Sequence, residues 1–158
     1  MTPTARTASS PDTRNTRMTA ETTSNSLPRA AGRLGATILT LPCGFHAYWA
    51  AGGEWGAATA FGSPELPPQA ASAAVAIVIA AAALLLLARV GLLATPLPNS
   101  MLRVGNRALV AAFTLVGVNN LIQAPDAYAR DWHVYFFGPL LLTLAALCAV
   151  AERSKSLR

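Results

Sequence analysis

The side chains best suited to chemistry are two histidines and a group of amides in apolar surroundings. His46 lies inside one apolar stretch, and His133 lies just before another. An unpaired polar group in hydrocarbon costs several kcal/mol, so each imidazole needs a hydrogen-bond partner or a ligand. The candidate partners are Asn119, Asn120 and Gln123. Asn119 and Gln123 are four residues apart, so they share one helix face.

Two interpretations of these polar side chains remain open. They form either an interhelical hydrogen-bond network that fixes packing, or a pocket for a small ligand, a lipid headgroup or a metal ion. A sharper version has His46 and His133 ligating a metal ion or haem iron. The sequence has no Cys-x-x-Cys-His motif and no carboxylate at ligand spacing beside either histidine. We therefore expect no metal ion and no cofactor.

Hydrolase motifs are also absent from the sequence. It contains neither Gly-x-Ser-x-Gly nor His-Glu-x-x-His, the patterns that place a nucleophile or a zinc ion beside a base. We expect no catalytic residues and favour a protein that is not an enzyme.

Four apolar stretches must position these side chains: Leu34–Ala51, Ala70–Ala88, Val104–Ile122 and Val134–Ala151. As helices, each is about 27–29 Å long, close to the roughly 30 Å hydrocarbon core of a bilayer. Charged residues make up only 12% of the chain, whereas an ordinary soluble domain has about 25%. The sequence predicts an all-α fold, an integral membrane four-helix bundle.

The charges lie unequally on the two sides that these stretches define. Eleven of the twelve Lys and Arg residues lie in the N-terminal tail, the second connection with its flanking helix turn, or the C-terminal tail. Four of the seven acidic residues lie in the first and third connections. Cytoplasmic loops are rich in Lys and Arg, so the pattern predicts a multi-pass protein of the cytoplasmic membrane with both termini in the cytoplasm.

The basic residues have two interpretations. They could attract anionic lipids, or they could record only the orientation in the membrane, which is the simpler interpretation. No basic stripe with interleaved aromatic residues occurs, so we expect no nucleic-acid partner. The expected partners are the lipid bilayer and either further copies of the chain or another membrane protein.

The predicted organisation has three parts. Residues 1–33 form a disordered cytoplasmic tail, because they are rich in Thr, Ser, Ala and Arg and nearly lack large apolar side chains. Residues 34–151 form the four-helix domain, and residues 152–158 form a short cytoplasmic tail. Polar residues collect at the outer ends of the first, third and fourth helices, whereas the cytoplasmic half has no comparable cluster beyond its basic fringe. The outer face is therefore the predicted working face.

The densest motif runs from the end of the first helix into the first connection. It is His46-Ala-Tyr48-Trp49-Ala-Ala-Gly52-Gly53-Glu54-Trp55-Gly56. The glycines permit a sharp exit from the helix through left-handed backbone conformations. The Tyr and Trp rings suit headgroup depth. Both are anchoring roles that need no ligand.

This motif resembles one in small bacterial membrane proteins of domain-of-unknown-function family 3995. In those proteins it ends the first helix, and a Pro-containing loop and three more helices follow. The matching positions are His46, Tyr48, Trp49, Gly52, Gly53, Trp55 and Gly56, with Pro64, Pro67 and Pro68 in the loop. The resemblance covers about residues 34–150. It implies an integral membrane protein and supplies no activity.

The sequence thus predicts a structural or accessory membrane protein. The alternative is binding or transport of a small ligand or lipid through a polar pocket on the extracytoplasmic half, and a third class is a haem or quinone redox protein. The candidate ligand-binding residues are His46, Tyr48, Trp49, Trp55, Asn119, Asn120, Gln123 and His133.

Overall fold

The computed structural model describes residues 11–61, 67–122 and 127–154, with side chains described for 26–60, 67–122 and 130–154. Its elements are helices, as predicted, and the described ranges hold no strand. The elements are α1 (Pro11–Ala50), α2 (Ala57–Phe61), α3 (Gln69–Arg89), α4 (Asn99–Ile122), α5 (Ala127–Trp132), the π-helix η1 (His133–Phe137) and α6 (Gly138–Glu152).

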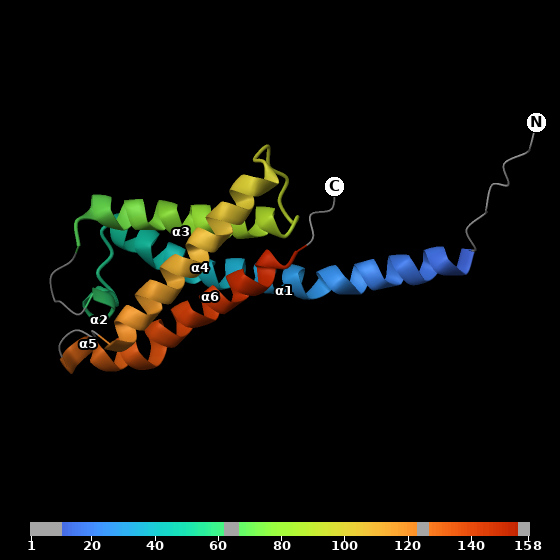
Figure 1. Cartoon of the computed structure of the whole chain (residues 1–158). Coiled ribbons are helices and arrows are strands. Elements are labelled where there is room, and N and C mark those ends of the chain that lie inside the picture. Colours follow the sequence, from blue (N-terminus) through green and yellow to red (C-terminus); the bar gives the residue numbers. More distant parts are fainter. Residues whose placement is uncertain (1–10, 62–66, 123–126, 155–158) are drawn as a thin grey trace, which may run out of the picture.

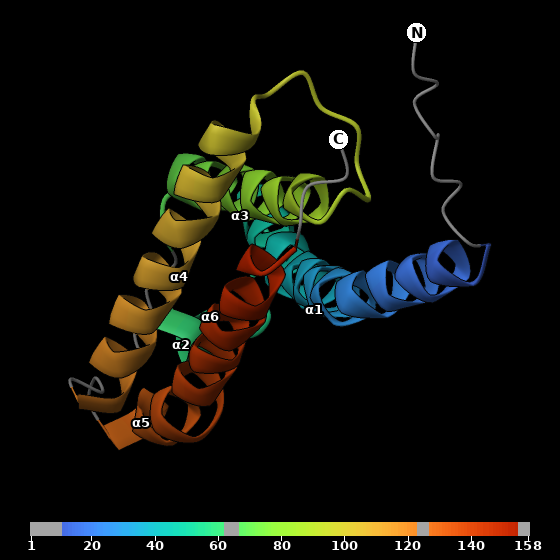
Figure 2. The same cartoon turned by 45° about the vertical axis from the view of Figure 1, so that its right-hand side comes forward.

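The long helices α1, α3, α4 and α6 run up and down beside one another (Figures 1 and 2). Helix α1 packs along α3, α4 packs along α6, and α1 also contacts α6. One end of the bundle, the basic end, carries Arg89, Arg103, Arg107 and Arg153. The opposite end, the aromatic end, carries Tyr48, Trp49, Trp55 and Trp132, together with the short helices α2 and α5.

Helix α1 is longer than the sequence predicted. It begins at Pro11 instead of Leu34, so residues 11–33, which we expected to be disordered, are part of this helix. It projects beyond the basic end of the bundle (Figure 1). Adding residues to a formed helix needs no new nucleus, so a polar segment can continue one. Residues 1–10 lie outside the described residues.

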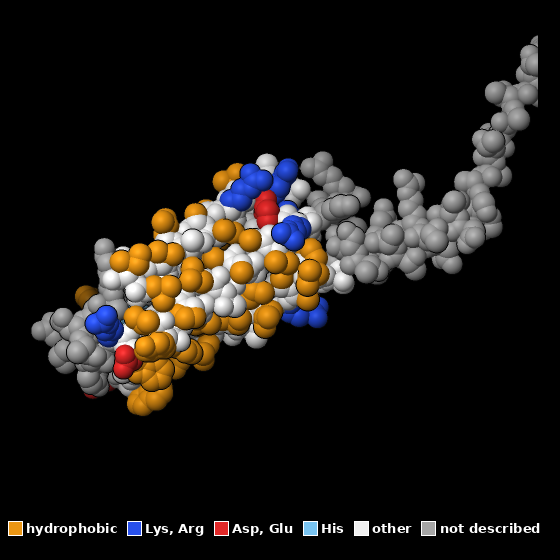
Figure 3. Space-filling model, turned by 60° about the horizontal axis from the view of Figure 1, so that its bottom comes forward, with side chains coloured by type: hydrophobic (Ala, Val, Ile, Leu, Met, Phe, Trp, Pro, Cys, Tyr) orange, Lys and Arg blue, Asp and Glu red, His pale blue; other side chains and the backbone are white. Residues whose placement is uncertain are grey.

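Within the described residues, three helical segments are long and apolar enough to cross a membrane: Gln69–Arg89, Asn99–Ile122 and Arg130–Glu152. Only 22%, 17% and 28% of their most apolar windows are buried inside the protein. Soluble proteins rarely expose contiguous apolar patches of this kind, whereas lipid tails are their natural surroundings. Figure 3 shows the resulting apolar surface between the charged ends of one face. These helices are therefore of the kind that could span a membrane.

The first predicted span, Leu34–Ala51, is not among those three segments. It coincides with the last part of α1, which packs along the apolar helix α3. The Leu86 side chain packs directly on Gly35 here, because a Cβ on Gly35 would lie 2.7 Å from Leu86 Cδ2. The structure therefore places this segment in the bundle, although its composition is less apolar than that of the other three.

The core between the helices is small. One buried cluster consists of Leu86, Val90, Cys148 and Ala151. A second consists of Leu39, Ala82 and Leu144. Both join α3 to α6, and the second also includes α1.

The helix before α6 begins earlier than predicted, because α5, η1 and α6 follow one another without a break. The π-turn ends two residues before Pro139, which lies in the first turn of α6. Proline has no N–H to donate, and its ring would clash with the carbonyl of the residue four positions earlier in a regular α-helix. The wider π-turn accommodates this, since the Gly138 N–H donates to the His133 carbonyl five residues back. This turn places His133 inside a helix, one residue before the predicted start at Val134.

Candidate functional site

Glycine ends α1 in the way that its spacing predicted. Gly52 has a φ of +92°, and its N–H donates to the Trp49 carbonyl at 3.0 Å. The Gly53 N–H donates to the Tyr48 carbonyl, also at 3.0 Å. These two bonds around a left-handed residue form a Schellman motif, which satisfies the last helix carbonyls and reverses the chain. A second left-handed glycine, Gly56 with φ +76°, precedes α2.

The reversal returns the loop onto α1, where aromatic rings hold it. The Trp49 indole, only 7% exposed, donates its Nε1–H to the Trp55 carbonyl at 3.0 Å. Phe45 stacks on Trp49 and Trp55, with ring centroids 5.7 and 5.9 Å apart. His46 meets Trp49 edge to face at 5.0 Å. The motif, together with Phe45 just before it, therefore builds one aromatic cluster from residues of the helix and the loop.

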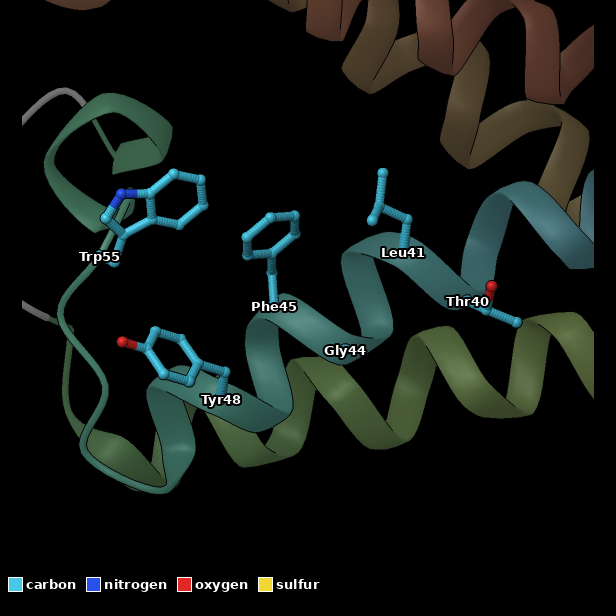
Figure 4. A pocket seen from close by; sticks show the side chains of 6 residues that line it. All are labelled: Thr40, Leu41, Gly44, Phe45, Tyr48 and Trp55. Atoms are coloured by element: carbon cyan, nitrogen blue, oxygen red, sulfur yellow. The ribbon is translucent and has the colours of Figure 1, made fainter.

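An open groove lies beside this aromatic cluster (Figure 4). It is lined by Thr40, Leu41, Gly44, Phe45, Tyr48 and Trp55 and has a volume of about 530 Å³. No charged side chain lines it, and the Thr40 hydroxyl donates to the Thr37 carbonyl at 2.7 Å. A Cβ on Gly44 would meet nothing within 4 Å, so this glycine leaves the floor of the groove open. The groove suits an apolar ligand.

The second predicted histidine meets one of the predicted amides. His133 Nδ1 lies 3.4 Å from Asn120 Oδ1, which joins η1 to α4. The His133 ring also lies against Phe137, with centroids 5.4 Å apart. His133 Nε2 is buried, and no residue in the described part of the chain bonds to it. This contact matches the packing network that the sequence left open.

The predicted site residues thus form two sets of contacts. His46, Tyr48, Trp49 and Trp55 lie together at the end of α1, and Asn120 and His133 lie together between α4 and η1. Asn119 is exposed. Gln123 lies outside the described residues. Helix α2 contacts α5 between the two sets.

The best-built polar cluster lies at the basic end, where sequence analysis expected only a basic fringe. Arg89 is buried, at 5% exposed, and its Nε donates to Glu152 Oε2 at 3.3 Å. Its terminal nitrogens donate to the carbonyls of Glu152 at 2.7 Å and Ser154 at 3.2 Å. This guanidinium therefore caps the C-terminal end of α6 from α3. The expectation of no cluster on this half was wrong.

Helix α4 contributes two further donors to the same carboxylate. Asn106, which is fully buried, donates to Glu152 Oε2 at 3.0 Å and to the Cys148 carbonyl at 2.9 Å. Arg107 Nε donates to Glu152 Oε1 at 3.2 Å from an exposed side chain. Glu152 thus ties together three helices. One residue in the sequence could have indicated this cluster. Asn106 is a polar residue near the start of one apolar stretch, and it lies at the same depth as Arg89, which follows the end of another apolar stretch.

Metal binding has no support in the described part of the chain. No three His, Cys, Asp or Glu side chains there lie close enough to hold an ion. Cys43 and Cys148 are not bonded to each other, and the Cys43 thiol lies 3.5 Å from the Ala76 carbonyl.

The fold and these clusters define a class: a small all-helical protein with helices that could span a membrane and a polar cluster around Glu152 at one end. A family model described as a protein of unknown function (DUF3995) matches residues 39–148. The match covers more than half of the chain, which therefore belongs to this family. The family suggested by the His46–Gly56 motif is thus confirmed. Comparison with curated proteins and with solved structures found no match.

Proposed function

We propose that this chain is a four-pass accessory protein of the cytoplasmic membrane that holds the apolar chain of a membrane lipid in the groove at its aromatic end. The observation that carries the proposal is the groove itself, with about 530 Å³ of space beside exposed apolar helices. Ligand pockets commonly have volumes of about 300–1,000 Å³. The proposal involves no reaction and no cofactor.

The fourth pass is the last part of α1. This segment packs along α3, which is apolar between Ala73 and Ala88, so both occupy the same depth. The basic end carries most of the described arginines and faces the cytoplasm in this proposal, since cytoplasmic loops are rich in Lys and Arg. An even number of passes then leaves both termini on that side.

Labelling of single cysteines from outside the cell tests this orientation. We introduce Glu54→Cys or Arg103→Cys into a chain whose Cys43 and Cys148 are replaced by alanine. A membrane-impermeant maleimide is expected to label the first variant in intact cells and the second only after lysis. Labelling of Arg103→Cys in intact cells, with Glu54→Cys protected, would reverse the proposed orientation.

The chemistry of the groove favours an acyl or isoprenoid chain over a polar solute. Leu41, Phe45 and the Trp55 ring provide apolar walls, and the Tyr48 hydroxyl and the Trp55 indole N–H are the side-chain polar groups that the lining offers beyond Thr40. Leu41 is 59% and Trp55 72% exposed, so the groove opens to the surroundings of the helix. Within a membrane those surroundings are lipid, and an apolar chain could enter sideways. The tyrosine hydroxyl would meet the polar start of such a chain at headgroup depth.

Filling the groove tests whether it binds a lipid chain. Gly44→Leu adds a side chain where nothing lies within 4 Å, whereas Ala47→Leu adds the same side chain to an exposed position outside the groove. The probe is phosphatidylcholine brominated on its acyl chains, titrated in detergent into chains carrying Trp132→Phe. The remaining reporters are then Trp49 and Trp55, both in the aromatic cluster.

We expect saturable quenching of the tryptophan fluorescence in the parent chain and in the Ala47→Leu variant. The Gly44→Leu variant should lose the saturable part, because its side chain occupies the space of the ligand. Equal quenching in all three, or quenching without saturation, would leave the groove without a ligand and favour an accessory role based on packing alone.

A further inference from the structure

Positive charge at the basic end exceeds the negative charge available to it. Arg89, Arg103, Arg107 and Arg153 lie there, and Glu152 is the acidic side chain among those described at this end. The buried Arg89 already uses this carboxylate and two backbone carbonyls. Figure 3 shows basic side chains around a single acidic one at the limit of the apolar surface. One carboxylate therefore cannot neutralise all four of these arginines within the described structure.

Glu152 also orients one of these arginines. It accepts a bond from Arg107 Nε at 3.2 Å, which holds the plane of the guanidinium. The Arg107 side chain is 70% exposed, and nothing in the described part of the chain accepts from its two terminal nitrogens. Such a pair of parallel N–H groups matches the oxygens of a phosphate. Arg107 is therefore positioned to donate a bidentate pair of hydrogen bonds outward.

A second arginine lies on the same face of α4. Arg103 precedes Arg107 by four residues, the spacing of neighbours on a helix surface, and it is exposed. Exposed apolar side chains adjoin this face of α4: Val104, 66% exposed, is three residues before Arg107, and Met101, 56% exposed, is three residues before Val104. A free ion would gain nothing from these apolar neighbours. A phosphate that carries acyl chains would meet both the arginines and the apolar helix surface.

We propose that Arg107 and Arg103 bind the phosphate of an anionic phospholipid headgroup, with Glu152 as the positioning residue for Arg107. The site lies at the opposite end of the bundle from the aromatic-end groove and does not depend on it. Basic pockets between membrane helices recognise lipid phosphates by this chemistry.

Native mass spectrometry of the full chain in uncharged detergent tests the site. The probes are phosphatidylglycerol, phosphatidylcholine and, separately, inorganic phosphate. We expect phosphatidylglycerol to bind more tightly than phosphatidylcholine. Arg107→Gln and Arg103→Gln should each weaken phosphatidylglycerol binding by about fivefold, the equivalent of about 1 kcal/mol per basic residue near a membrane surface. Arg130→Gln, at the other end of the molecule, is the matched control and should change nothing.

Three results would overturn the proposal. One is equal binding of the two lipids. Another is an equal loss in Arg130→Gln, which would indicate a response to net charge alone. The third is displacement of phosphatidylglycerol by inorganic phosphate at the same concentration, which would assign the site to a soluble ion. Arg103→Gln keeps the bond between Arg107 and Glu152, so it tests the site even if Arg107→Gln alters the fold.

Discussion

Replacing Glu152 with glutamine is expected to lower the free energy of unfolding by about 3–5 kcal/mol, the usual cost of removing one partner from a buried ion pair. The side chain of Arg89 is only 3% exposed, so its charge has no access to water once the carboxylate is gone. The amide would also lose acceptor capacity for Asn106 and Arg107. Chemical unfolding of the purified chain in detergent measures the effect.

The control for this variant is Arg107→Gln, which breaks the exposed bond to the same carboxylate. The Arg107 side chain is 70% exposed, and exposed ion pairs contribute only about 0–1 kcal/mol. The double variant Arg89→Gln with Glu152→Gln should cost less than the sum of its two single changes, because the two charges interact directly. A Glu152→Gln variant as stable as Arg107→Gln would show that the Arg89–Glu152 ion pair does not hold the helices together.

Truncation of Leu86 to alanine is the second change with a large expected effect. Leu86 is fully buried in α3, between Gly35 of α1 and the cluster that includes Cys148. In a membrane the transfer of apolar surface from water no longer contributes, so the loss comes from the cavity that remains. We expect Leu86→Ala to lower the free energy of unfolding by about 2 kcal/mol, near the low end of the range for buried leucines.

Leu84→Ala provides the matched control on the same helix. Leu84 is 54% exposed, on a surface that faces lipid in our proposal. Lipid tails would fill the space that the truncation leaves, so this variant should unfold within about 0.5 kcal/mol of the parent chain. Equal losses from Leu84→Ala and Leu86→Ala would mean that α3 is covered on both faces, which would contradict a lipid-facing surface. Both free energies come from the same unfolding measurement.

The sequence predicted α3 to within one residue at each end, because a predominantly apolar run without charge, bounded by Pro68 and Arg89, defines both limits. It placed the start of α4 five residues too late, since Asn99–Arg103 is polar enough to read as a connection. The start of α1 was placed later still, because composition alone does not show that an apolar helix will continue into a polar segment.

The aromatic motif shows where local and tertiary information separate. Gly52 ends α1 for a reason that involves only its own backbone and the preceding turn, so the sequence was sufficient to predict it. The groove forms only when the loop folds back and stacks Trp55 on Phe45. It stays open because no other part of the described chain packs against Gly44. Neither is a property of contiguous residues.

The order of the residues was enough to predict that the chain is helical, that its apolar helices suit a bilayer and that its charges gather at one end. These properties depend on neighbouring residues and on the solvent, so they need no knowledge of packing. By contrast, the contact of Arg89 with Glu152, 63 residues later, and the bond from Asn106 to the same carboxylate became evident from the packed helices alone. Such contacts depend on which helices lie side by side and on their relative rotation. For that reason the charged residues that indicated only orientation in the sequence form, in the structure, the buried Arg89–Glu152 ion pair and the bond from Arg107 to Glu152.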